Sequence, residues 1–182
     1  SFTNKFVKTE GFLKEQKVDK FIYRGVFGTQ KKGGAINNAF NLNLKNIANT
    51  HVIKLGDELL ALWEAAGPHS LNPNNLETNG LTTLKGVLKK NEAFSAHPKV
   101  DFNSNSADEV LITFGVQTGP TSTIRLMEFS NSGKNSGQIL FDRKDKLKGF
   151  AFLHDFAITT NWAIFLQNAI DFNPLPFVIG QK

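Results

Sequence analysis

The four histidines, His51, His69, His97 and His154, are the side chains of this sequence that could do the most chemistry. Imidazole binds transition metals and carries protons near neutral pH, so each ring is a candidate ligand or acid–base group. The sequence contains no HExxH motif, no glycine-rich phosphate loop and no GxSxG turn. It also contains no cysteine, which excludes disulfides, thiolate catalysis and cysteine–zinc sites. A metal site would have to be assembled from histidines that are far apart in the chain.

Two of these histidines lie among apolar and aromatic residues: His97 in FSAHPKVD and His154 in GFAFLHDFAIT. An imidazole buried in such a run is unstable without a polar partner, so each ring needs an explanation. Their separation of 57 residues alone favours core or surface positions over a shared metal. In a β-propeller the expectation changes, because the inner strands of different blades all direct side chains at the central axis.

Two carboxylates accompany these runs. Glu64 closes the apolar run LLALWE, and Asp155 directly follows His154. A ligand histidine needs an acceptor for its second ring nitrogen, and a carboxylate is a common choice. Glu64 is therefore a candidate to hold such a ring in place, while a strand-end glutamate that reaches water is the alternative. Asp155 is expected to face away from His154, because neighbouring residues of a strand point to opposite faces.

The elements that must position these residues are expected to be short strands separated by turns, with almost no helix. Three hairpins are predicted: NIANTHVIKL with ELLALWE around Gly56-Asp57, EVLITFGV with STIRLMEF around QTGPT, and AFLHDFAIT with WAIFLQN around Thr160-Asn161. The run GQILFD is a further strand candidate, and FIYRGVF (21–27) is strand-like. The stretch PHSLNPNNLETNG is predicted to be a long polar loop.

Hairpins at intervals of roughly 50–60 residues favour an all-β propeller with one blade per interval, and a sandwich is the alternative. The apolar runs are continuous, which fits sheets covered on both faces. By this spacing, residues 1–182 form one incomplete domain of about three blades, whereas a propeller closes with at least four. The chain is therefore not expected to complete the ring.

The composition, 40% hydrophobic and 20% charged, is typical of a soluble globular protein. No apolar run approaches the ~18 residues that cross a bilayer, and the first residues do not resemble a secretory signal. Residues 1–35 hold eight basic and three acidic side chains, and so carry the whole net charge of +5. This basic N-terminal segment, which leads into the first blade, is expected to form a solvated face or to be attracted to an anionic membrane surface. Nucleic-acid binding is not expected, because no basic–aromatic recognition motif is present.

Several motifs together resemble the carotenoid cleavage oxygenase family, which includes apocarotenoid oxygenases and the retinoid isomerase. They are NLNLKNIANTHVI, GDELLALWEAAGPHSLNPNNLETNG, FSAHPKVD, GFAFLHDFAIT and NPLPF. The likeness extends from about Phe21 onward and is greatest to cyanobacterial and plant members. It implies part of a seven-bladed β-propeller with ferrous iron, Fe2+, on its axis. In that family four histidines bind the iron, three glutamates hold some of them in place, and dioxygen is added across a carbon–carbon double bond to give two carbonyl products.

The resemblance also implies roles for residues of this chain. The histidine of the AHP motif falls on His97, that of the HDF motif on His154, and the glutamate of the ALWE motif on Glu64. His51 and His69 match no ligand position. The other two histidines and two glutamates of the family belong to later blades, which this sequence lacks. The remaining blades are expected on a missing part of the chain or on another polypeptide, and we expect a fragment of a longer protein.

The expected function is therefore that of a non-haem iron dioxygenase acting on a carotenoid or apocarotenoid, with this chain holding part of the site. A non-catalytic propeller fragment without iron is the alternative, and within the enzyme class a stilbene is an alternative substrate. The expected partners are the substrate, dioxygen and a membrane surface contacted peripherally. The expected location is cytoplasmic, in a cyanobacterial cytosol or a plastid, with peripheral contact to a membrane.

Overall fold

The computed structural model describes residues 2–23, 45–102, 109–119 and 121–167, together with residues 175 and 179. The chain divides into two compact units, and each is treated by itself. One unit comprises residues 1–7 and 48–170, and the other comprises residues 8–47 and 171–182. The first unit is built from strands, as predicted, and contains all four histidines. Within the described residues, no helix is long and apolar enough to cross a membrane.

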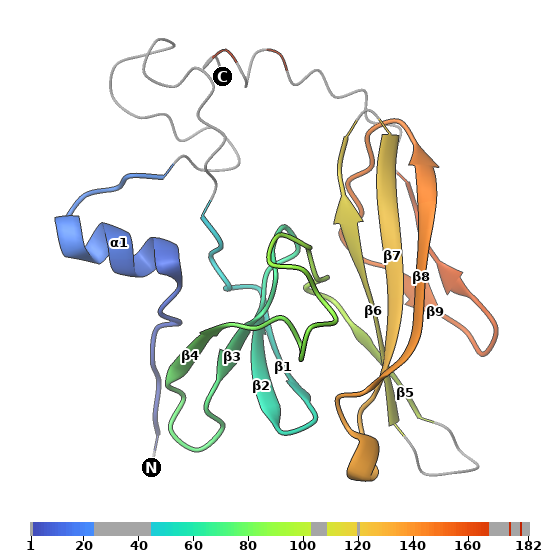
Figure 1. Cartoon of the computed structure of the whole chain (residues 1–182), viewed down its shortest axis with the longest axis horizontal. Helices are drawn as coiled ribbons and strands as arrows, with labels where there is room; N and C mark the ends of the chain where they lie inside the picture. Colours follow the sequence, from blue (N-terminus) through green and yellow to red (C-terminus); the bar gives the residue numbers. More distant parts are fainter. Residues whose placement is uncertain are drawn as a thin grey trace. The chain divides into compact units, whose positions relative to one another are not determined.

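The first sheet of the larger unit is a four-stranded antiparallel meander, drawn in cyan and green in Figure 1. Its strands follow the chain in the order β1 (His51–Leu55), β2 (Glu58–Leu62), β3 (His69–Leu71) and β4 (Thr78–Leu81). The predicted hairpin around Gly56-Asp57 is confirmed, since Leu55 pairs with Glu58. Gly56 has a φ of 60°, a left-handed conformation that a two-residue hairpin turn requires and glycine adopts without strain.

The prediction of a long polar loop over PHSLNPNNLETNG is wrong, because β3 and β4 form there. Residues of β3 are buried although two of the three are polar, and β3 pairs with both β2 and β4. The tip between them is closed by side chain–backbone hydrogen bonds: Asn72 Oδ1 accepts from the N–H of Asn74, and Asn75 Oδ1 accepts from the N–H of Glu77. Asparagines in such turns give a loop-like composition to what is a hairpin.

The second sheet is also a four-stranded antiparallel meander, drawn in yellow and orange in Figure 1. Its strands are β5 (Lys99–Phe102), β6 (Glu109–Gln117), β7 (Thr121–Ser130) and β8 (Ile139–Lys148), with a short 3-10 helix, η1 (Gly133–Asn135), before β8. The predicted β6–β7 hairpin and the further strand at GQILFD are confirmed, and β5 was not anticipated. Each meander has the arrangement of one propeller blade.

A third, two-stranded piece follows: β9 (Ala157–Ile158) and β10 (Ala163–Ile164) pair around the predicted Thr160-Asn161 turn. The hairpin is confirmed, but it is short. Residues 151–156 are irregular, so the prediction that His154 lies in a strand is wrong. The reason is packing: Phe156 and Phe165 stack on each other and both meet Phe114 of β6 edge-on, which anchors this segment to the second sheet.

One hydrophobic core joins the first two sheets. It combines side chains of the β1–β2 hairpin, of β6 and β7, and of the segment between β4 and β5: Leu55, Leu60, Leu62, Leu84, Leu88, Phe94, Ala96, Leu111, Met127 and Phe129. The backbones also approach closely, since a Cβ atom added at Gly115 would lie 2.1 Å from the carbonyl oxygen of Ala93. Residues 93–96 are therefore packed tightly between the two blades.

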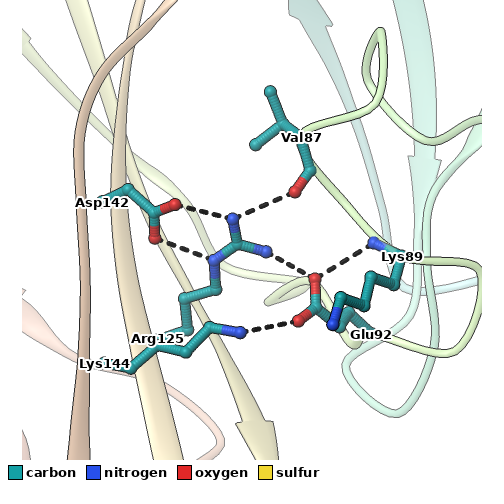
Figure 2. A network of polar contacts seen from close by, with 6 residues as sticks. All are labelled: Val87, Lys89, Glu92, Arg125, Asp142 and Lys144. Carbon is teal, nitrogen blue, oxygen red and sulfur yellow. Dashed lines mark hydrogen bonds and ion pairs between the residues drawn. The ribbon is translucent and has the colours of Figure 1, made fainter.

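A charged network binds the same inter-blade segment to the second sheet (Figure 2). Arg125 of β7 donates two hydrogen bonds to the Asp142 carboxylate of β8, one to Glu92 and one to the carbonyl oxygen of Val87. Lys144 also donates to Glu92, at 2.9 Å. Two cations thus neutralise two carboxylates in a partly buried place, which fastens residues 87–92 to strands β7 and β8.

The smaller unit contains α1 (Glu10–Val18), drawn in blue in Figure 1, a nine-residue helix that the sequence analysis does not identify. The local signals are those of helix ends: Thr9 Oγ1 accepts from the N–H of Phe12 at 3.1 Å, and Asp19 ends the helix in a left-handed conformation. The basic N-terminal segment is therefore helical over part of its length. Residues 21–23 are not in a strand, and the rest of the predicted strand at 21–27 lies outside the described residues.

Candidate metal centre

His97 lies in the inter-blade segment, just before β5, and its backbone is held by two side chains. The N–H of His97 donates to Ser95 Oγ at 3.0 Å, and the carbonyl oxygen of Ala96 lies 3.0 Å from Nδ1 of His51. Ser95 itself is buried, and its N–H donates to the carbonyl oxygen of Phe114 at 2.6 Å. Contacts from both blades therefore set the direction in which the His97 side chain leaves the chain.

His154 projects from an irregular segment whose neighbours are buried. Ala151, Leu153 and Phe156 are each at most 6% exposed, whereas the side chain of His154 is 57% exposed. The first residue of the segment is held by a buried side chain, since Ser122 Oγ accepts a hydrogen bond from the N–H of Ala151 at 2.9 Å. The apolar residues around His154 thus anchor the segment to the core and leave the imidazole outside it, which explains a histidine in so apolar a run.

The structure brings His97 and His154 together. Their Nε2 atoms are 3.1 Å apart, and their rings meet edge-on with centroids 4.6 Å apart. Two nitrogens bound to one metal ion at about 2.1 Å each, with a right angle between the bonds, lie about 3.0 Å apart. The spacing of the two nitrogens therefore suits a pair of neighbouring ligands of one ion.

Glu64 lies two residues after β2 and reaches the other nitrogen of His154. Its Oε1 atom is 3.1 Å from His154 Nδ1, and its side chain is 17% exposed. A carboxylate accepts, so Nδ1 carries the proton and donates, and the neutral ring is left with a lone pair on Nε2. This is how a carboxylate orients a metal-ligating histidine and fixes its tautomer. The 3.1 Å contact between the two Nε2 atoms then requires a proton on Nε2 of His97.

The carboxylate of Asp155 has partners of its own. Asp155 pairs with Lys99 at 2.8 Å and accepts from the N–H of Phe156 at 2.8 Å, and its carboxylate also interacts electrostatically with His97. Burial would raise the pKa of Asp155, but the hydrogen bonds from Lys99 and Phe156 outweigh it and lower the pKa. His69 is buried in β3, where it is 2% exposed.

His51 is the residue of this region that the sequence analysis did not identify. It begins β1, donates through Nδ1 to the carbonyl oxygen of Ala96, and its ring centroid lies 6.4 Å from that of His97. A signal did exist in the predicted hairpin: with a turn at Gly56-Asp57, His51 pairs with Leu62, two residues before Glu64. Register alone therefore places His51 near the end of the strand that leads to Glu64.

The donors present fit iron(II) in kind, because neutral imidazole nitrogens suit divalent iron. Within the residues that the structure describes, no group of three or more histidine, cysteine, aspartate or glutamate side chains could hold a metal ion. The described residues bring together two imidazole nitrogens, those of His97 and His154, and one carboxylate, that of Glu64.

Comparisons with known proteins identify relatives of this chain. Residues 1–180 match the family model RPE65, described as retinal pigment epithelial membrane protein. The chain is 46% identical, over its whole length, to apocarotenoid-15,15'-oxygenase of Synechocystis, of which it covers 36%. It is 29% identical to resveratrol cleavage oxygenase 1 of Aspergillus fumigatus, over 91% of the chain and 30% of that protein. The chain therefore spans about a third of the length of the curated relatives that it matches.

Solved structures show the same relationship. A variant of Synechocystis apocarotenoid oxygenase superposes with a TM-score of 0.91 over 97% of this chain and 36% of that one, and a cobalt-substituted form of the enzyme superposes with a TM-score of 0.90. Other solved variants of that enzyme change a threonine and, further on, an adjacent tryptophan and glutamate. Thr50, Trp63 and Glu64 have the same types in the same order with the same spacing. The fold is part of a seven-bladed β-propeller, as predicted, and the chain belongs to the RPE65 family of carotenoid cleavage oxygenases.

Proposed function

We propose that this chain is part of an iron(II)-dependent dioxygenase that cleaves a carbon–carbon double bond of an apocarotenoid. The observation that carries the proposal is the 3.1 Å approach of the Nε2 atoms of His97 and His154, with Glu64 on the far nitrogen of His154. The 46% identity to the Synechocystis apocarotenoid oxygenase supports an apocarotenoid as the substrate class.

His97 and His154 would hold the iron through Nε2, and Glu64 would keep Nε2 of His154 unprotonated by accepting the proton of Nδ1. His97 must then carry its own proton on Nδ1, so metal binding changes the tautomer of His97 and leaves that of His154 as it is. When bound, iron(II) would supply the activation of dioxygen for its reaction with the alkene, and His97 and His154 would hold the ion. The two further imidazoles expected for the family would come from blades outside this sequence.

The reaction balances without a further reductant. One molecule of dioxygen and one carbon–carbon double bond give two carbonyl groups, and each product receives one oxygen atom. The residues of this chain need not donate or remove a proton in that balance. Their proposed role is to hold the metal ion and to orient the ligand nitrogens with their lone pairs free. His97 and His154 would do the first, and Glu64 would do the second for His154.

A stilbene is the second candidate substrate, because relatives that share 26–29% identity with this chain include resveratrol cleavage oxygenase 1 and a lignostilbene dioxygenase. It is less favoured because the identity to the apocarotenoid enzyme is higher, at 46%. A non-catalytic protein without iron is the third reading, and a metal measurement separates it from both enzymes.

The test uses the protein expressed from its whole gene and loaded with Fe2+ without oxygen. We expect stoichiometric iron, and cleavage of an apocarotenal to two carbonyl products that carry ¹⁸O when ¹⁸O₂ is supplied. His97→Ala and His154→Ala should each lose stoichiometric iron and cleavage. Asp155→Asn is the matched control, because it lies in the same segment but faces Lys99, and it should keep both.

The outcomes separate the readings. Resveratrol in place of the apocarotenal tests the stilbene: faster cleavage of resveratrol would replace the proposed substrate class. A folded protein that takes up no iron would favour the non-catalytic reading. Full iron and full activity in His154→Ala would refute the assignment of the site.

A further inference from the structure

We propose that His51 is a positioning residue for His97: it aims the ligand nitrogen of His97 by holding the peptide group that joins Ala96 to His97. This inference rests on the proposed function, because it concerns the metal that His97 would bind. Nothing in the motif pattern assigns His51 a role, and its importance comes from a contact between residues 45 positions apart.

Both ends of one peptide group are held by side chains. Its carbonyl oxygen, on Ala96, is 3.0 Å from Nδ1 of His51, and its N–H, on His97, donates to Ser95 Oγ at 3.0 Å. Buried backbone groups outside strand ladders are paired with side chains or water instead, and here two side chains take that part. Here the plane of the peptide that precedes the ligand residue cannot rotate without breaking at least one of these bonds.

One restraint comes from the first sheet, and the other comes from a residue of the inter-blade segment that is itself bound to the second sheet. His51 begins β1 of the first sheet, whereas the N–H of Ser95 is bound to the carbonyl oxygen of Phe114 in β6 of the second sheet. The backbone at His97 is therefore connected to the first sheet through His51 and to the second sheet through Ser95. A ligand nitrogen must be held within about 0.5 Å of its working position, so rotation of this peptide would matter for metal binding.

The role of His51 is positional, not ligating. A carbonyl oxygen can only accept, so Nδ1 of His51 carries a proton and donates it to Ala96. That nitrogen is occupied by the backbone. The described residues also contain no group of three metal-binding side chains, so His51 does not complete a ligand set with His97 and His154. Its ring lies beside that of His97, with centroids 6.4 Å apart and planes 32° apart.

The restraint can be removed with little loss of stability. The side chain of His51 is exposed, and its hydrogen bond to the carbonyl oxygen of buried Ala96 is expected to contribute about 1 kcal/mol. The effect on metal binding should therefore be separable from an effect on folding. Ser95 offers no such separation, because it is 1% exposed and its hydroxyl lies in the core.

The experiment compares His51→Phe, which keeps a ring but lacks the donor, with His51→Asn, whose side-chain amide can donate to the same carbonyl oxygen. Both are made in the whole protein. Affinity for Fe2+ and Co2+ is measured by competition with a chelator, and the visible d–d spectrum of the cobalt form reports the ligand geometry. We expect His51→Phe to bind the metals about 10-fold more weakly, with a shifted cobalt spectrum, and His51→Asn to recover most of the affinity.

Two controls make the result decisive. Val52→Ala changes the exposed neighbour on β1 and should leave affinity and spectrum unchanged. His97→Ala tests the proposed function separately and should abolish tight binding. If His51→Phe keeps the affinity and spectrum of the wild type while His97→Ala loses binding, the role of His51 is refuted and the proposed function stands. If His97→Ala also keeps its affinity, the proposed function fails. A loss in His51→Phe that is matched by lower thermal stability and is not recovered by His51→Asn would also refute the positioning role.

Discussion

Two polar clusters, one around Arg125 and one around His97 and His154, join segments that are far apart in this chain. They differ in the number of hydrogen bonds and ion pairs that their side chains make. In the Arg125 network, a guanidinium and Lys144 meet the carboxylates of Glu92 and Asp142, with the remaining donor on the carbonyl oxygen of Val87 (Figure 2). In the histidine cluster, Glu64 binds one nitrogen of His154, and the two Nε2 atoms of His97 and His154 face each other with a single proton to share.

Burial follows the same division. The side chain of Arg125 is 13% exposed, and that of His154 is 57% exposed. The partly buried set of charges fastens residues 87–92 to the second sheet, because Arg125 joins Glu92, Asp142 and the carbonyl oxygen of Val87 and is itself only 13% exposed. The pair of imidazoles is less enclosed, since the side chain of His154 is 57% exposed, and it is expected to stabilise the fold little. The comparison predicts that mutations in the two clusters will affect different measurements.

The largest expected effect on folding is that of Arg125→Met, which keeps the apolar stem and removes the guanidinium. Glu92 and Asp142 would lose their shared cation, and the inter-blade segment would lose the bond to Val87. We expect the free energy of unfolding of the whole protein to fall by about 2–4 kcal/mol in urea titrations. The matched control is Arg143→Met on β8, whose side chain is 65% exposed and pairs with Asp145. It should cost less than about 0.5 kcal/mol, and equal losses in the two variants would contradict the comparison.

A smaller effect, on binding rather than folding, is expected for Glu64→Gln. The amide oxygen can still accept from Nδ1 of His154, but the negative charge that favours the bound metal is gone. We expect Fe2+ and Co2+ to bind about 10-fold more weakly, with an unchanged midpoint of unfolding for the metal-free protein. Glu64→Ala removes the acceptor as well and should weaken binding further, up to about 100-fold. An unchanged affinity in both variants would show that the contact between Glu64 and His154 does not serve the metal.

The pH dependence of stability gives a third test. Burial would raise the pKa of Glu92, but hydrogen bonds from Lys144 and Lys89 and the charge of Arg125 lower it, and the hydrogen bond from Arg125 lowers the pKa of Asp142. Both carboxylates have pKa values below their ordinary values of 4.5 and 3.8, so their stabilising contribution is present above those values and is lost as the pH falls through the lowered ones.

Unfolding free energies of wild type and Arg125→Met, measured between about pH 7 and pH 2, should therefore converge at the acid end. Arg125→Met should also show the shallower decline below about pH 4, because its carboxylates have lost the cation that lowers their pKa. A gap between the two proteins that stays constant over the whole range would contradict the role of these carboxylates.

The smallest effect is expected for His154→Ala on the folding of the metal-free protein. Most of this side chain is in water, and the residues that anchor its segment are Ala151, Leu153 and Phe156. We expect the free energy of unfolding to change by less than about 1 kcal/mol, although metal binding is lost. Phe156→Ala is the contrasting variant, since it removes a 6% exposed ring stacked on Phe165, and it should cost about 3 kcal/mol. A larger loss in His154→Ala than in Phe156→Ala would reverse the comparison.

Particular elements show why part of the fold was predictable. The hairpins around Gly56-Asp57, QTGPT and Thr160-Asn161 were found because strong apolar runs flank short turns, which is local information. The β3–β4 hairpin was missed because its buried strand is short and its turn is rich in asparagine. Helix α1 was missed because its apolar periodicity is weak and its ends depend on Thr9 and Asp19.

The sequence alone was enough to propose His97, His154 and Glu64 as site residues, because each lies in a motif that resembles one of the carotenoid cleavage oxygenase family. Their meeting could not be predicted, because it requires residues 57 and 90 positions apart to be brought within 3.1 Å by the packing of separate sheets. The same packing places the His154 side chain outside the core and His51 within hydrogen-bond distance of the carbonyl oxygen of Ala96. Local patterns are set by neighbours in sequence, whereas these contacts depend on a shared hydrophobic core and on backbone positions that only the assembled blades define.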